Sequence, residues 1–186
     1  MTTAFVLGNG LSRKDIDLAV LSKSGTIYGC NALYRDFVPD VLVATDRDIS
    51  EHIQRSKYAL TYCFYTRDPI GNLGARRIPE QWWKFSSGPV AVALAAEDKH
   101  TKIYMLGFDM GPSETGHFNN VYADTEFYKK SSAVPTYTGN WVNQIIEIIK
   151  KFPTTEFIRV VGTTTAQIKN LENFPNLLHT PIQQFR

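Results

Sequence analysis

FVLGNGLSRKDID, residues 5–17, is the stretch that decides the fold, because an apolar run ends abruptly in Gly8-Asn9-Gly10 and Ser12 follows. Glycines let a backbone turn tightly and approach a ligand, and the free N–H groups of a following helix attract an anion. The dinucleotide motif G-x-G-x-x-G requires a third glycine where this chain has Arg13. The stretch therefore predicts a strand, a phosphate-binding turn and a helix, and it argues against a nicotinamide or flavin site.

Further apolar runs repeat this arrangement along the chain. Continuous apolar runs predict strands at 5–7, 26–28, 41–45, 59–64, 102–106 and 157–161. The segments between them predict helices at 15–21, 48–55, 87–99 and 139–152. Alternating strands and helices predict an α/β fold, a Rossmann-like three-layer α/β/α sandwich with a mainly parallel sheet, formed by residues 1–186 as a single domain.

Composition restricts the classes of partner. The chain has 186 residues, 43% of them hydrophobic and 20% charged, with a formal net charge of +2. These values are typical of a globular protein and do not indicate a nucleic-acid partner. No apolar run is long enough for a membrane span, and no signal-peptide pattern opens the sequence. We expect a cytoplasmic protein in which Cys30 and Cys63 are reduced, buried thiols.

Polar residues follow several of the predicted strands. In parallel α/β sheets ligands bind outside the carboxyl ends of the strands, so these residues are expected to share one edge. They are Gly8, Asn9, Gly10 and Ser12 after the first strand, Asn31 after the second, Asp46 after the third, Asp109 after the fifth, and Ser86, Ser87 and Gly88 at a helix start. The alternative for each of them is turn or capping chemistry without a ligand.

Two irregular segments, residues 66–84 and 109–137, interrupt the pattern. Long connections of this kind often serve as lids or binding loops, and 109–137 carries His117, Lys129 and Lys130. A surface excursion or a contact in a homo-oligomer is the alternative. His117 is a candidate acid or base, since an unperturbed histidine titrates near pH 6.5, and a surface histidine is the alternative.

The clusters together resemble a known family. GNGLSRKDID at 8–17, CNALY at 30–34 and SSGPVAVALAAEDKHTKIYMLGFDM at 86–110 are similar in order and kind to motifs of the family 42 bacterial sialyltransferases. Archaeal 6-hydroxymethyl-dihydropterin pyrophosphokinases have a comparable opening turn and core. The resemblance implies that Asn9 and Ser12 contact the phosphate of a nucleotide and Asn31 its nucleoside. It also implies that the three residues 86–88 line the same donor site.

The late helix departs from the family pattern. Tyr137-Thr138-Gly139-Asn140 stands where the sialyltransferases have Tyr-x-Gly-His, and neutral Asn140 cannot act as a general base. It would instead orient a substrate by hydrogen bonding. Asp46 replaces an amide of the family and could bond a ribose hydroxyl or assist a metal.

The sequence therefore predicts a transferase that uses a nucleotide-activated donor, either a nucleotide sugar such as a CMP-sugar or a pyrophosphoryl nucleotide. The alternative is a non-catalytic nucleotide-binding or structural protein. No cofactor is firmly implied, and a divalent cation near Asp46 and Asp48 stands as an alternative to solvated or capping carboxylates.

Overall fold

All strands within the described residues join one parallel sheet. The computed structural model describes residues 2–185. The strands are β1 (Thr3–Leu7), β2 (Thr26–Cys30), β3 (Val41–Ala44), β4 (Phe64–Thr66), β5 (Arg76–Arg77), β6 (Lys102–Leu106), β7 (Glu156–Val161) and β8 (Leu177–Pro181). They run in the order β5-β4-β3-β2-β1-β6-β7-β8, and every neighbouring pair is parallel. This confirms the predicted α/β, Rossmann-like class.

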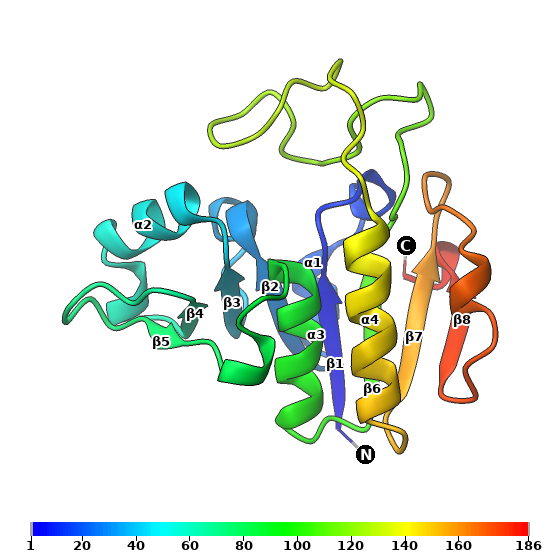
Figure 1. Cartoon of the computed structure of the whole chain (residues 1–186), viewed down its shortest axis with the longest axis horizontal. Coiled ribbons are helices and arrows are strands. Elements are labelled where there is room, and N and C mark those ends of the chain that lie inside the picture. Colours follow the sequence, from blue (N-terminus) through cyan, green and yellow to red (C-terminus); the bar gives the residue numbers. More distant parts are fainter. Residues whose placement is uncertain (1, 186) are drawn as a thin grey trace.

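Helices cover both faces of this sheet. The helices are α1 (Leu18–Leu21), α2 (Arg47–Arg55), α3 (Ser87–Glu97) and α4 (Gly139–Lys151). Figure 1 shows α3 and α4 side by side in front of the sheet, where they pack on Ala4 and Val6 of β1. Phe5 and Leu7 point to the opposite face, in the core that includes Ile53 of α2. The alternation along β1 thus divides the core between two layers.

β1 lies at the point where the topology changes direction. The chain passes from β1 through β2, β3 and β4 to β5 on one side, and then crosses to β6 on the other side of β1. Thr3 pairs with Lys102, and Leu7 pairs with Leu106. The carboxyl ends of β1 and β6 therefore meet at a topological switch point, where open α/β sheets place their ligands.

Several element boundaries differ from the predicted ones. The prediction of a strand at 59–64 was wrong for all of these residues except Phe64. Tyr58–Leu60 form a 3-10 helix, and β4 begins only at Phe64. Helix α1 is shorter than predicted, because the Asp17 carboxylate accepts from the amides of Ala19 and Val20 and so caps it at Leu18.

Two edge strands had no predicted counterpart. β5 contains only two residues, both of them exposed. In β8 only Leu177 is buried, so this strand has neither the continuous apolar run nor the alternation that marks a strand. Within residues 2–185 no helix is both long and apolar enough to cross a membrane.

Candidate functional site

A cavity of about 200 Å³ opens at the carboxyl edge of the sheet, at the switch point between β1 and β6. Its walls come from the ends of β1, β2, β3 and β6, the start of α3 and the segment after β6. The lining residues are Gly8, Asn9, Gly10, Cys30, Asn31, Asp46, Ser86, Ser87, Gly88, Pro89, Gly107, Phe108, Asp109, Met110, Gly111, Asn119, Asn120 and Trp141.

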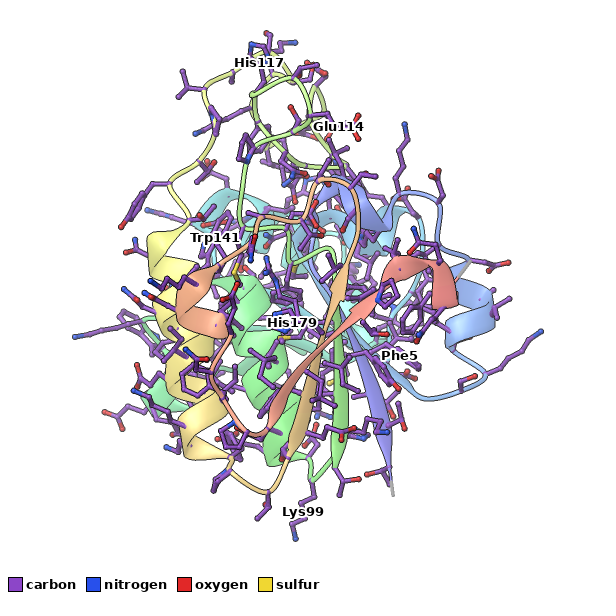
Figure 2. All side chains as sticks on the ribbon, turned by 90° about the vertical axis from the view of Figure 1, so that its right-hand side faces the viewer. Phe5, Lys99, Glu114, His117, Trp141 and His179 are labelled. Carbon is purple, nitrogen blue, oxygen red and sulfur yellow. The ribbon has the colours of Figure 1, made fainter. Side chains whose placement is uncertain are left out.

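Most of the predicted binding residues line this cavity. They are Gly8, Asn9, Gly10, Asn31, Asp46, Ser86, Ser87 and Gly88. Three predicted residues lie outside its wall: Ser12, His117 and Asn140. Ser12 is buried behind the turn, whereas His117 and Asn140 are exposed. Figure 2 shows His117 at the outer end of the loop, well beyond Trp141, the residue of α4 that does line the cavity.

The glycine turn after β1 bonds to the protein itself. The amides of Gly8 and Gly10 donate to the carbonyls of Leu106 and Gly107 at 2.8 and 2.9 Å. The next two amides donate to side chains, Leu11 to Asn119 Oδ1 at 2.8 Å and Ser12 to Asp109 Oδ2 at 3.0 Å. These four N–H groups are therefore already occupied in the structure.

Asp109 occupies the position that an anion would take at this turn. Its carboxylate accepts from the amide and the hydroxyl of Ser12. It also accepts from Thr164 Oγ1 at 2.6 Å, Thr165 Oγ1 at 3.2 Å and Asn119 Nδ2 at 3.2 Å. Five donors from three distant segments thus hold one buried carboxylate. A buried carboxylate with this many donors is stabilised where it stands, which makes Asp109 a structural anion.

The start of α3 has a different arrangement. The Ser87 hydroxyl accepts from the Thr45 amide at 2.9 Å, contacts Thr45 Oγ1 at 2.9 Å and donates to Asn31 Oδ1 at 2.9 Å. The amide of Ser86 donates to Gln144 Oε1 of α4. The amides of Ser87 and Gly88 have no acceptor within residues 2–185, as expected for the first turn of a helix, and both residues line the cavity.

Two asparagines stand at the cavity with different degrees of freedom. Asn31 has a left-handed backbone with φ of 52°, and its Oδ1 is held by Ser87, so its Nδ2 group remains as a donor. Asn9 is held at both ends: its Oδ1 accepts from Arg13, and its Nδ2 donates to the Tyr128 hydroxyl, each at 3.3 Å. Asn31 is thus the freer side chain for a ligand.

Three arginines carry positive charge at this edge: Arg13 and Arg159 are buried, and Arg67 is half-buried. Arg13 donates to the carbonyl of Gly8, Arg67 to that of Thr45 at 3.1 Å, and Arg159 to that of Phe108 at 2.9 Å. None of the three forms an ion pair within residues 2–185. Burial lowers the pKa of Arg159 to about 10, which leaves it protonated at neutral pH. Guanidinium charges that are bound only to neutral oxygen atoms favour an anion nearby.

The acidic and sulfur groups restrict the chemistry further. Cys30 lines the cavity, and its thiol donates to the carbonyl of Leu7 at 3.4 Å. Burial raises the pKa of Cys30 to about 12, so a thiolate nucleophile is absent near neutral pH. Asp46 is an exposed carboxylate at the N-cap of α2 with no capping bond. Within residues 2–185 no three His, Cys, Asp or Glu residues gather as a metal site would require.

The segment predicted as a lid supplies one wall of the cavity. Residues 109–111, Asn119 and Asn120 face the ligand space, and Figure 1 shows the loop standing over the carboxyl edge of the sheet. Its inner part is anchored, since the amide of Val121 donates to the carbonyl of Asn9 at 2.8 Å. The Tyr128 hydroxyl also accepts from the amide of Ala32 at 3.3 Å.

Three residues that bind Asp109 were not predicted from the sequence, because they lie far from the first turn along the chain. Thr164 and Thr165, which bind Asp109, follow β7, and Asn119 lies inside the irregular loop. No local pattern marks them, because each acts through a contact with a residue remote in sequence. Comparison with protein-family models, with curated proteins and with solved structures finds no match for this chain.

Proposed function

We propose that this protein is a transferase that binds a nucleotide-activated donor in the cavity at the switch point. The observation that carries the proposal is the convergence of four strand ends on one cavity whose free donors include the first amides of α3 and Asn31 Nδ2. Phosphoryl and glycosyl transfer depend mainly on positioning and on stabilising the charge of the leaving phosphate. A helix N-terminus that lines a cavity supplies that kind of stabilisation.

We expect the phosphate to bind at α3 rather than at the glycine turn. The amides of Ser87 and Gly88 are open, whereas those of Leu11 and Ser12 are taken. Arg67, which binds the carbonyl of Thr45 behind Ser87, adds positive charge below this position. We expect Asn31 Nδ2, which has no acceptor within residues 2–185, to donate to the nucleoside.

The resemblance to family 42 sialyltransferases and to the archaeal pyrophosphokinases supports the same substrate class. The donor would be a nucleotide sugar such as a CMP-sugar, or a pyrophosphoryl nucleotide. Free thiols at Cys30 and Cys63 agree with a cytoplasmic location. A homo-oligomer and a bound divalent cation stay predictions.

A second candidate is a nucleotide-binding protein without catalysis. The observation that favours it is that neither His117 nor Asn140 lines the cavity. Under this view the site has the same ligand and the same phosphate position, and it releases the donor unchanged. Binding and turnover must therefore be measured separately.

The first experiment measures thermal unfolding with CMP, CDP, UDP, GDP and ATP, each with and without Mg²⁺. A ligand at a hundredfold excess over its Kd stabilises the native state by about 2.7 kcal/mol. For a chain of this size that raises the Tm by roughly 5–10 °C. Absence of any shift across the panel would remove both candidate functions.

The cavity is tested with Gly88→Met and with Asn143→Met as its control. A Cβ at Gly88 lies 3.4 Å from the Phe108 ring, so the fold accepts a side chain there, and the rest of the methionine enters the cavity. Asn143 is an exposed residue of α4 outside the cavity. We expect the nucleotide-induced Tm shift to vanish in Gly88→Met and to persist in Asn143→Met. Consumption of CMP-, UDP- and GDP-sugars and of ATP then separates a transferase from a binding protein.

A further inference from the structure

A second cavity of about 200 Å³ adjoins the first one. It is lined by Asn31, Asp46, Arg47, Asp48, Ile49, Phe127 and Tyr128, from the end of β2, the start of α2 and the irregular loop. Asn31 and Asp46 line both cavities. A molecule in the second cavity would therefore meet a donor in the first cavity at these two side chains.

Asp46 is the carboxylate with access to both spaces. It is exposed, and its side chain makes no capping bond and accepts from no donor within residues 2–185. The other carboxylate of the first cavity, Asp109, already accepts hydrogen bonds from five donors. Asp48 lines only the second cavity. A proton acceptor for a reaction between the two cavities is thus available at Asp46 alone among these three.

The second cavity combines aromatic residues with groups that bind hydroxyls. Phe127 keeps a left-handed backbone with φ of 71°. Its ring contacts His52 of α2 edge-on at 5.3 Å, and the Arg35 guanidinium lies 5.9 Å from its centroid. Aromatic side chains offer apolar area, while Asp46, Asp48 and Asn31 offer acceptors and donors. A saccharide, which has apolar C–H faces and many hydroxyls, matches this lining.

We propose that the second cavity binds a saccharide acceptor and that Asp46 is the general base that activates one of its hydroxyls. This rests on the proposed function of the first cavity. Asp46 takes the hydroxyl proton, and the acceptor oxygen forms a bond to the activated atom of the donor, the anomeric carbon of a nucleotide sugar or the transferred phosphorus. The bond from that atom to the leaving phosphate oxygen breaks, and its electron pair stays on the nucleotide phosphate at the start of α3.

Saccharide binding is tested first, without any donor. Saturation-transfer NMR with methyl glycosides of glucose, galactose, mannose and N-acetylglucosamine should show contacts with the native protein. Phe127→Ala should weaken these contacts about tenfold, and Val134→Ala should leave them unchanged. Val134 is an 80% exposed residue of the same loop that lies outside both cavities. Binding of no glycoside, or equal binding by both variants, overturns the acceptor site whatever the first cavity does.

The role of Asp46 is tested with Asp46→Asn and with Asp68→Asn as the matched control. Asp68 is a highly exposed carboxylate in the connection after β4, outside both cavities. Removal of a general base costs about 10²- to 10⁴-fold in rate. We expect kcat for release of nucleotide from its sugar donor, with acceptor present, to fall by that factor in Asp46→Asn and to be native in Asp68→Asn.

A measurement of nucleotide binding separates the proposed role of Asp46 from the proposed transferase function of the first cavity. If Asp46→Asn binds the nucleotide within about threefold of the native protein but has lost turnover, the base is supported. If Asp46→Asn keeps native kcat, the base assignment is overturned while the transferase stands. If the native protein binds nucleotide and consumes no donor, the transferase and the base fail together. The glycoside test still decides the second cavity in that case.

Discussion

Two helix starts at the same edge of the sheet look alike in sequence and differ in the structure. The first is the Gly8–Ser12 turn, and the second is Ser86-Ser87-Gly88 at the start of α3. Both offer glycine, serine and first-turn amides, and both were predicted to line the donor site, the first of them by binding its phosphate. At the first, Asp109 and Asn119 take the amides of Ser12 and Leu11. At the second, two amides remain open towards the cavity.

Glycine stands at the two helix starts for different physical reasons. A Cβ on Gly10 would lie 2.4 Å from Asp109 Cγ, so a side chain there collides with the carboxylate that closes the turn. A Cβ on Gly88 would meet its nearest atom, on the Phe108 ring, at an ordinary 3.4 Å. A glycine-rich turn can therefore serve the packing of the protein's own anion as readily as it serves a ligand. Only the contacts distinguish the two.

Removing the internal anion is expected to have the largest effect. Asp109→Ala leaves the amide and hydroxyl of Ser12 and the hydroxyl of Thr164 without their acceptor, which costs about 3–5 kcal/mol of unfolding free energy. Urea unfolding measures the loss, with Asp68→Ala near native as the control. Asp109→Asn keeps one acceptor oxygen and should lose less. A loss below about 1 kcal/mol in Asp109→Ala would contradict the structural role.

The Asp109→Ala variant can also make the Gly8–Ser12 turn resemble the start of α3, with donors that are open to an anion. With the carboxylate gone, the amide and hydroxyl of Ser12 and the hydroxyl of Thr164 surround a vacated anion position. Inorganic phosphate at roughly 10 mM should then raise the Tm of Asp109→Ala more than that of the native protein. An equal rise in both proteins would mean that the turn does not attract anions at all.

Adding one methyl group to each glycine separates the starts directly. Gly10→Ala should lose about 1–3 kcal/mol through the contact with Asp109 and the carbonyl of Gly107. Gly88→Ala should keep native stability or gain up to about 1 kcal/mol, because alanine favours a helix over glycine. Denaturant midpoints of the two variants give the comparison. If Gly88→Ala were the less stable of the two, the assigned causes would be reversed.

The Ser87→Ala variant tests whether Ser87, at the start of α3, serves the fold alone or also orients Asn31 for a ligand. The substitution leaves the buried amide and hydroxyl of Thr45 without Ser87 Oγ and releases Asn31 Oδ1, which should cost about 1–2 kcal/mol. It should also reduce the nucleotide-induced Tm shift, because Asn31 is no longer oriented. Ser56→Ala at the end of α2 is a control outside both cavities. Loss of stability with an unchanged ligand shift would limit Ser87 to a structural role.

Gln144→Ala is expected to have the smallest effect. It frees the amide of Ser86, which costs about 0.5–1.5 kcal/mol and leaves a third open donor at the start of α3. Calorimetric titration with CMP or CDP, whichever the native protein binds, should show unchanged or modestly tighter binding. Binding at least tenfold weaker would show that Gln144 orders this start for the ligand.

The central strands were predictable because each is a continuous apolar run covered on both faces. β1, β2, β3, β6 and β7 were found for this reason, and their carboxyl ends located most of the cavity wall. β8 was missed because its single buried residue, Leu177, leaves no pattern. Tyr58 and Ala59 are buried and apolar like strand residues, yet they form a 3-10 helix that packs on the rings of Tyr62 and Phe64.

The closing of the glycine turn was not predictable from local sequence. Asp109 had been noted as a strand-end residue, but its donors at Thr164 and Thr165 lie beyond α4 and β7. The sequence of the irregular loop, residues 109–137, has no periodicity that would indicate the path of its backbone. Neither the exposed position of His117 nor the anchoring of Tyr128 on Asn9 could therefore be derived from the sequence.

The position of β1 in the middle of the sheet has a consequence for how the chain folds. β1 can pair with β2 early, but its other partner, β6, begins at Lys102, and the Ser12–Asp109 contact closes only after that strand is in place. Parallel sheets dominated by such remote pairings fold slowly, and an unpaired central edge exposes backbone that other chains can bind. Until β6 arrives, the nascent chain should therefore be most prone to misassociation along the open edge of β1.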